Sequence, residues 1–201
     1  MLAVAGGKGG SGKTTTALGT AGALVERRRR PLVVDCDLDA PNLHLRAGVP
    51  RDPGVGAATD ARVHESSEVP GVDVLPAGDA DGDDLAAALD ALPESRPTLL
   101  DCPAGASEAA VRPLRAADAC VVVATDTREG VEDAVKTTAM ARAVGTPVRA
   151  VAVVRATTVP AGLAGATAAD TVAVPAAATP LDATETAAAY ARLADYVEPN
   201  T

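Results

Sequence analysis

The chain has 201 residues, with 18 lysines and arginines against 27 aspartates and glutamates, so its formal net charge is −9. This length suits one domain that buries its own core, and we expect residues 1–201 to form a single domain. The acidic excess argues against a protein that coats DNA or an anionic membrane. We therefore expect Arg27–Arg30 to be a solvated helix end rather than a DNA contact.

The composition is skewed toward small aliphatic residues, with 46 alanines, 25 valines and 17 leucines but no isoleucine, phenylalanine or tryptophan. Arginines outnumber lysines 15 to 3. An acidic chain with few lysines and small core residues suggests a cytoplasm of very high salt. No run approaches the roughly 18 apolar residues of a membrane span. A glycine-rich motif begins too early for a signal peptide to precede it, so we expect a soluble, cytoplasmic protein with reduced thiols.

Short apolar runs alternate with longer helical patterns along the chain. The predicted strands are Leu2–Ala5, Leu32–Cys36, Val72–Leu75, Thr98–Cys102, Ala119–Ala124, Val148–Val154 and Thr171–Val174. The predicted helices run from Thr14 to Arg28, Asp83 to Leu92, Ser107 to Ala116, Gly130 to Val144 and Leu181 to Val197. The strands are continuously apolar, which is typical of a sheet covered on both faces. We predict a doubly wound α/β domain with a mostly parallel sheet of about seven strands.

The segment after the first strand fits the phosphate-loop pattern G-x-x-x-x-G-K-[ST], with a strand before it and a helix after it. Glycines let backbone amides close around phosphate oxygens, and the helix presents its positive end to the anion. Two of the three lysines in this arginine-rich chain lie in the loop. The predicted phosphate ligands are Gly7, Lys8, Gly9, Gly10, Ser11, Gly12, Lys13, Thr14 and Thr15. Lys13 would reach the β- and γ-phosphates, and the Thr14 hydroxyl would bind Mg²⁺.

Carboxylates lie at or just beyond the ends of two of the predicted strands. Leu32–Cys36 runs into Asp35, Asp37 and Asp39, and Thr98–Cys102 contains Asp101. Strand ends beside a phosphate loop are where α/β sheets bind ligands. Carboxylates there can hold Mg²⁺ and orient an attacking water.

The run Lys8-Gly9-Gly10-Ser11-Gly12-Lys13-Thr14-Thr15 resembles the deviant Walker A motif KGGxGKTT of the MinD/ParA/Mrp P-loop ATPases, most nearly the short archaeal MinD-like members. The resemblance implies ATP and Mg²⁺ as cofactors, ATP hydrolysis, and a homodimer when ATP is bound. In that family the early lysine contacts the partner's ATP phosphates, a role that would fall to Lys8.

The two acidic segments resemble the family's switch regions. By that resemblance Asp35 would lie near Mg²⁺ and Asp37 would position the hydrolytic water, while Asp39 has no assigned role. The remaining matches are Asn42 in switch I, Asp101 as the Walker B carboxylate and residues 103–105 as switch II. Many members also carry Asn-Arg after the sixth strand to hold adenine. Here Val154 replaces that asparagine, so Arg155 and Pro175 are the predicted base-site residues.

The resemblance predicts an ATP-dependent dimerising switch that hydrolyses ATP slowly and controls a protein partner or its positioning. The basic membrane-binding helix of MinD is missing, because residues 182–201 carry four acids and one base, a net of −3. One alternative is an Mrp-like metal-cluster carrier, although Cys36, Cys102 and Cys120 form no C-x-x-C pair. The others are a ligase or amidotransferase of the dethiobiotin/cobyrinate group, and a scaffold that binds nucleotide without hydrolysis.

Overall fold

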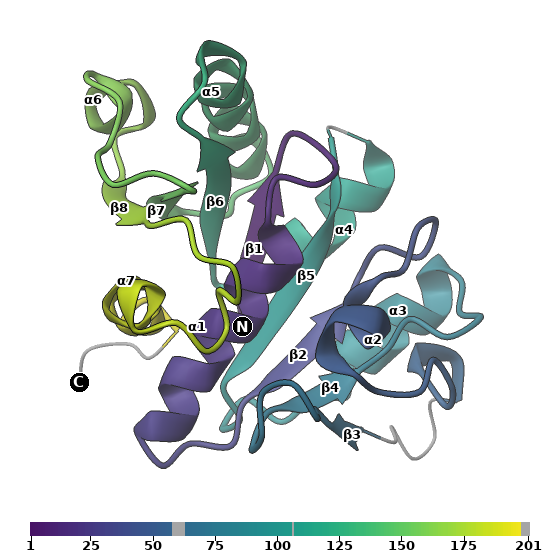
Figure 1. Cartoon of the computed structure of the whole chain (residues 1–201). Helices are drawn as coiled ribbons and strands as arrows, with labels where there is room; N and C mark the ends of the chain where they lie inside the picture. The colour runs from purple at the N-terminus through teal and green to yellow at the C-terminus, as the bar shows by residue number, and fades with distance from the viewer. Residues whose placement is uncertain (58–62, 106, 198–201) are drawn as a thin grey trace.

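The computed structural model describes residues 1–57, 63–105 and 107–197. Within them one eight-stranded sheet has the order β3-β4-β2-β5-β1-β6-β7-β8 (Figure 1). The strands are β1 Leu2–Gly6, β2 Leu32–Asp35, β3 His64–Glu65, β4 Asp73–Leu75, β5 Thr98–Ala104, β6 Ala119–Thr125, β7 Val148–Val154 and β8 Asp170–Val174. The predicted doubly wound, mostly parallel α/β fold is confirmed.

The strand β1 occupies the centre of the sheet, with Leu2 beside Leu99 of β5 on one edge and beside Ala119 of β6 on the other. All pairings are parallel except that between β3 and β4. The register sets Asp35 directly opposite Asp101. The chain leaves β1 toward β2 on one side, and β6 flanks β1 on the other. The end of β1 is therefore a topological switch point, where α/β sheets bind ligands.

Helices cover both faces of the sheet (Figure 1). The helices are α1 Lys13–Glu26, α2 Leu43–Ala47, α3 Gly82–Asp90, α4 Glu108–Ala116, α5 Arg128–Ala143, α6 Leu163–Thr167 and α7 Thr184–Ala194, with a 3₁₀ turn, η1, at Val55–Ala57. One core forms where α1, α2 and α7 pack on the sheet, and another where α3 to α6 pack on the opposite face. Both cores consist mainly of valine, leucine and alanine, as the composition requires.

The close packing of α1 against α7 depends on a glycine. A Cβ atom at Gly19 would lie 2.4 Å from the ring of Tyr190. Tyr190 is buried against this face of the sheet, and it is one of the two aromatic residues in the chain. The glycine therefore lets the Tyr190 ring fill the space between the two helices.

The predicted strands are all present, and the helices differ from prediction mainly at their ends. The first helix begins at Lys13 and ends at Glu26, and the last covers Thr184–Ala194 rather than Leu181 to Val197. Sequence patterns missed four short elements, α2, η1, α6 and β3, and β3 raises the number of strands from the predicted seven to eight. Residues 198–201 of the predicted polar tail lie outside the described residues. No helix in the described part of the chain is long and apolar enough to cross a membrane.

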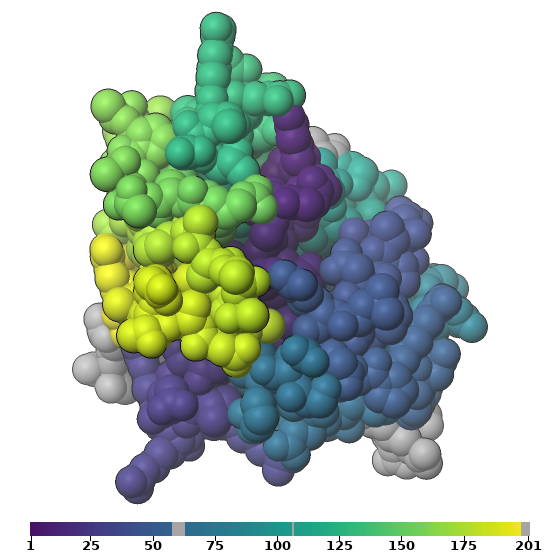
Figure 2. All heavy atoms as spheres, viewed as in Figure 1, coloured from purple at the N-terminus to yellow at the C-terminus, as the bar shows by residue number. Residues whose placement is uncertain are grey.

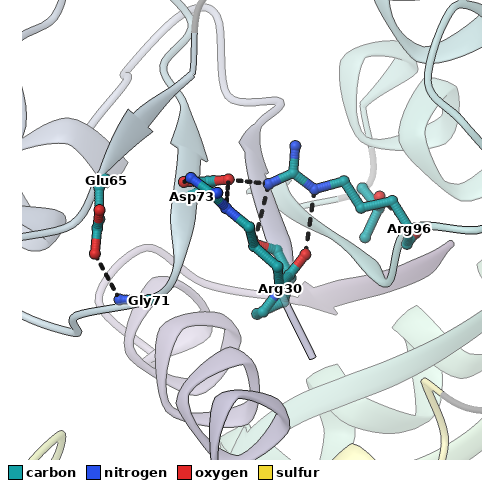
Figure 3. Close-up of polar contacts among 7 residues, drawn as sticks. Arg30, Glu65, Gly71, Asp73 and Arg96 are labelled. Atoms are coloured by element: carbon teal, nitrogen blue, oxygen red, sulfur yellow. Dashed lines mark hydrogen bonds and ion pairs between the residues drawn. The ribbon is translucent and has the colours of Figure 1, made fainter. Parts of the chain in front are cut away.

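An ion-pair cluster joins the starts of β2, β4 and β5, at the end of the sheet opposite the phosphate loop (Figure 3). Asp73 is buried and binds Arg30 in a two-pronged contact, with Nε–Oδ2 at 2.8 Å and Nη2–Oδ1 at 3.2 Å. Arg96 donates to the same carboxylate. Arg27 separately donates to Asp195 at 2.7 Å. Arg27 to Arg30 are exposed, as expected of a solvated helix end. Arg27 and Arg30 also form ion pairs that join strand and helix ends.

Candidate functional site

The phosphate loop joins the end of β1 to the start of α1. Gly10 and Gly12 have φ angles of 74° and 99°, in the left-handed region that favours glycine. The Nζ atom of Lys13 donates to the carbonyl oxygen of Lys8 at 3.2 Å, so its ammonium lies over the loop. The Ser11 hydroxyl is buried and has no hydrogen-bond partner among the described residues. The loop therefore offers an ammonium and an unpaired buried hydroxyl, both of which can donate to a phosphate oxygen.

A cavity of about 620 Å³ opens in front of this loop. Figure 2 shows the purple N-terminal segment recessed between the yellow C-terminal segment and the blue segment that follows β2. Of the predicted site residues, those that line the cavity are Gly9, Gly10, Gly12, Lys13, Thr14, Thr15, Asp37, Asp101 and Arg155. We call this space the phosphate cavity. The fold thus brings the loop and both acidic strand ends to one opening.

Asp35, at the end of β2, organises the loop that leads to α2. Its Oδ1 atom accepts a hydrogen bond from the amide of Asp37, and its Oδ2 atom accepts one from the amide of Leu43, both at 3.1 Å. Burial raises the pKa of Asp35 to about 6, although these hydrogen bonds act in the opposite direction. Both of its oxygens are already engaged, so Asp35 holds the switch I backbone in place near the cavity.

Asp101, on the adjacent strand β5, differs from Asp35 in the hydrogen bonding of its carboxylate oxygens. Its Oδ1 atom is buried and lacks a hydrogen-bond partner within the described part of the chain. Burial raises the pKa of Asp101 to about 7, and Thr14 and Lys13 oppose that rise. A buried, unpaired carboxylate oxygen is costly unless a cation or a proton compensates it.

These features fit a magnesium ion. Mg²⁺ prefers oxygen ligands and usually takes only one or two carboxylates, with water and phosphate oxygens completing its shell. Asp101 offers the unpaired oxygen, the Thr14 hydroxyl lines the same cavity, and Asp35 lies opposite Asp101 in the register. The described residues contain no group of three or more His, Cys, Asp or Glu that could hold a metal by themselves.

Of the predicted switch I residues, Asn42 is tied to the start of α1, and Asp37 lines the phosphate cavity. The hydroxyl of Thr14 donates to Asn42 Oδ1 at 2.9 Å, which joins the start of α1 to the residue that precedes α2. Asp37 lines the phosphate cavity, and its Oδ1 atom accepts a hydrogen bond from the amide of Ala40 at 3.1 Å. A ligand that binds Thr14 would compete with this bond to Asn42, and so would act on switch I directly.

A smaller cavity of about 210 Å³ adjoins the first, and we call it the base cavity. It holds both predicted base-site residues, Arg155 after β7 and Pro175 after β8. Gly12, Thr15, Arg46 and Arg155 line both cavities, so the two spaces meet beside the phosphate loop. This arrangement matches a nucleotide whose phosphates and base occupy neighbouring spaces.

Lys8 does not point into the phosphate cavity. Its ammonium forms an ion pair with Glu129 of α5 and lies 4.0 Å from Asp133 Oδ2 on the same helix. The neighbouring Gly7 packs closely on Asp133, where a Cβ atom would lie 2.5 Å from the Asp133 Cβ. In the single chain, this end of the loop is therefore held against α5.

Sequence reasoning missed Arg46. This residue lies on α2, and its Nε atom donates to the Thr15 hydroxyl at 3.3 Å while its side chain lines both cavities. The five-residue helix α2 is too short for a periodic pattern to be detected. In the sequence, the one feature that could have marked Arg46 as a site residue is its positive charge four residues after Asn42 of the predicted switch I.

The chain matches the CobQ/CobB/MinD/ParA nucleotide binding domain over residues 2–165. An uncharacterised ATP-binding protein of Methanocaldococcus jannaschii is 32% identical over 163 residues, which are 73% of this chain and 61% of that protein. The chromosome partitioning protein ParA of Caulobacter vibrioides is 33% identical over 146 residues, which are 61% of this chain and 54% of ParA. The chain thus matches only 54–61% of the length of these relatives.

A solved structure shows the same fold. The septum site-determining protein MinD of Pyrococcus horikoshii, complexed with Mg-ADP, has a TM-score of 0.79 at 23% identity, and the match covers 98% of this chain and 95% of MinD. The chain belongs to the CobQ/CobB/MinD/ParA family of nucleotide-binding domains.

Proposed function

We propose that this protein is an ATP-dependent switch that dimerises when ATP and Mg²⁺ bind, hydrolyses ATP slowly to ADP and phosphate, and thereby controls a protein partner. The observation that carries the proposal is the meeting of three segments at one cavity: the loop with Lys13, switch I with Asp37, and the β5 end with Asp101. This combination supports phosphate binding, water positioning and metal binding at a single site.

In the proposed cycle, Lys13 and the loop amides bind the β- and γ-phosphates. Thr14, Asp35 and Asp101 would hold Mg²⁺, which neutralises phosphate charge when it is bound. Asp37 orients the attacking water. Because Asp35 fixes the switch I backbone and Thr14 contacts Asn42, nucleotide state would be transmitted to α2. The surface around α2 would then bind or release the partner.

Dimerisation through Lys8 is a further part of the proposal. Lys8 is half exposed, at 47%, so its ammonium is accessible to a second chain. To reach a partner's phosphates it must first leave Glu129. Loss of the γ-phosphate would remove the competing anion and return Lys8 to its own α5. The exchange of one anionic partner for another gives the dimer its dependence on nucleotide.

The metal-carrier alternative has little support. Cys36, Cys102 and Cys120 are all buried, and burial raises the pKa of each thiol. A cluster ligand must be a thiolate and must be reached from outside. Two competitors remain. One is a non-hydrolysing scaffold, because binding a nucleotide at this site does not require its hydrolysis. The other is a ligase or amidotransferase of the dethiobiotin/cobyrinate group, which shares the family's nucleotide-binding domain.

ATP turnover decides between the switch and the scaffold. Phosphate release should be measured in molar KCl for the wild-type chain and for Asp37→Ala, with the affinity for MgATP measured alongside. The switch predicts slow wild-type turnover that falls at least tenfold in Asp37→Ala while MgATP still binds. Equal, negligible turnover in both proteins would favour the scaffold. A pull-down with the ATP-bound Asp37→Ala protein would then identify the partner.

A further inference from the structure

Arg46 of α2 is a cationic side chain at the junction of the phosphate cavity and the base cavity, and the proposed cycle gives it no role. Its Nε atom donates to the Thr15 hydroxyl at 3.3 Å. Its two terminal nitrogens have no hydrogen-bond or ion-pair partner, in side chain or backbone, among the described residues. A guanidinium has five N–H donors and no acceptor, so most of the hydrogen-bonding capacity of Arg46 is available to a ligand.

The packing of α2 fixes where this side chain begins. Leu43 and Ala47 are buried in the core beneath α2, while Arg46 is exposed. The far end of Arg46 is held at Thr15, and its charge acts on Tyr190 of α7. Burial raises the pKa of Tyr190 to about 12, and the positive charge of Arg46 opposes that rise. The guanidinium therefore lies close to the start of α1 and to α7.

The start of α1, which Arg46 contacts, is a helix end without a cap of its own. The N-cap residue Gly12 has no side chain to accept a hydrogen bond, and the first turn contains no acidic residue. The amide of Thr16 donates to the carbonyl oxygen of Gly12 at 2.9 Å and so begins the helical bonding. The helical amides that precede it are left for an anion, which the positive end of the helix also favours. Arg46 adds a full positive charge at the same place.

A nucleotide that fills both cavities must pass this point. Gly12, Thr15 and Arg46 line the phosphate cavity and the base cavity alike. With Lys13 at the β- and γ-phosphates and the base in the smaller cavity, the α-phosphate and the ribose are the groups left for the junction. The α-phosphate is an anion whose non-bridging oxygens accept hydrogen bonds, whereas the ribose is neutral. A guanidinium at this point therefore suits the α-phosphate.

We infer that Arg46 binds a non-bridging oxygen of the α-phosphate, so that α2 supplies a phosphate ligand to the nucleotide site. The inference rests on the proposed nucleotide-binding function and adds a residue to it. Because ATP and ADP both carry an α-phosphate, the contact forms with either nucleotide. The helix α2 therefore keeps a contact with the nucleotide after the γ-phosphate has left, while its other contact, from Asn42 to Thr14, competes with Mg²⁺.

Calorimetric titration with MgATP and with MgADP tests which phosphate Arg46 contacts. Arg46→Gln should weaken the binding of both nucleotides by a similar factor of about ten. The matched control is Arg115→Gln, which makes the same change in net charge at an exposed position of α4 outside both cavities and should bind as the wild type does. A loss confined to MgATP would place Arg46 at the γ-phosphate and overturn the inference. Failure of the wild-type chain to bind either nucleotide would instead overturn the proposed function.

The two diastereomers of ATPαS distinguish a contact with the α-phosphate from a contact with the ribose. They differ only in which non-bridging oxygen of the α-phosphate is replaced by sulfur, a poorer hydrogen-bond acceptor. Arg46→Gln should change the ratio of their dissociation constants about threefold or more. Arg46→Lys keeps the charge but loses the planar fork, so it should move the ratio in the same direction by a smaller factor, and it provides the test if Arg46→Gln does not fold. Contact with the ribose, or a general loosening of the loop, would weaken both diastereomers alike, so a ratio that stays at the wild-type value would overturn the inference.

Discussion

The ammonium of Lys8 is ion-paired with the carboxylate of Glu129 in the same chain. The contact lowers the pKa of Glu129, because the hydrogen bond and the positive charge of Lys8 stabilise its ionised form. Since the proposed dimer needs Lys8 at the partner's phosphates, Glu129 and the second nucleotide compete for one lysine.

This competition makes a prediction about dimerisation. Lys8→Ala should bind MgATP within about threefold of the wild-type affinity but remain a monomer by light scattering. Glu129→Gln should form the MgATP dimer at lower protein concentration, by no more than about fivefold, since the pair is solvent-exposed. An MgATP dimer of Lys8→Ala would contradict the role given to this lysine.

The buried carboxyl of Asp101 predicts a pH dependence of stability without nucleotide. Its pKa is about 7 in the folded chain, against an ordinary value of 3.8, because burial disfavours the charge. The folded state therefore holds this proton more tightly, so the contribution of Asp101 to stability is greatest below pH 4 and falls as the pH rises to about 7. Asp35, with a pKa of about 6, acts in the same direction.

Thermal unfolding tests this sign. The loss of Tm between pH 5 and pH 8 should be smaller in Asp101→Asn than in the wild-type chain, and MgATP should reduce the loss in the wild-type chain. The comparison with the variant removes the general effect of an acidic chain becoming more negative. An equal loss of Tm in both proteins would show that Asp101 is not the group that titrates.

The charge composition predicts a dependence on salt. With a net charge of −9, the excess carboxylates of the folded chain repel one another. Salt weakens this repulsion, because the Debye screening length shortens from about 10 Å at 0.1 M to about 3 Å at 1 M. We expect the Tm to fall when the protein is dialysed from molar KCl into dilute buffer. A Tm that does not change on dialysis would remove the high-salt interpretation.

The cluster around Asp73 predicts a loss of stability without a loss of binding. Asp73→Ala removes the buried carboxylate that accepts from both Arg30 and Arg96, and the Tm should fall by about 4–8 °C. The exposed carboxylate of Asp195, paired with Arg27, is the matched control, and Asp195→Ala should lower the Tm by less than about 2 °C. Neither variant should change the affinity for MgATP, because both pairs lie away from the loop.

The sequence predicted the strands well because most are short runs rich in valine, leucine and alanine, which is typical of a parallel sheet buried on both faces. The phosphate loop was equally clear, since its glycines and Lys13 form a local pattern. The short elements α2, α6 and β3 have two to five residues each, too few for periodicity to distinguish them from loops.

The finer parts of the site depend on long-range contacts that no local pattern carries. Asp35 and Asp101 look alike as strand-end carboxylates, yet only the structure shows that one is engaged by backbone amides and the other keeps a free oxygen. The partner of Lys8 is 121 residues away in the chain. Arg46 and Arg155 are also distant in sequence, and the fold brings both to the walls of the same two cavities. Side-chain partners of this kind follow from tertiary packing.

The central claim is that the loop from Gly7 to Thr14 binds a triphosphate through Lys13. Calorimetric titration of Lys13→Ala with MgATP tests it most directly, with Lys136→Ala as the control because that lysine is exposed on α5 and outside the cavity. The account predicts that Lys13→Ala weakens MgATP binding at least a hundredfold while Lys136→Ala binds as the wild type does. Equal affinity in Lys13→Ala and the wild-type chain would contradict it.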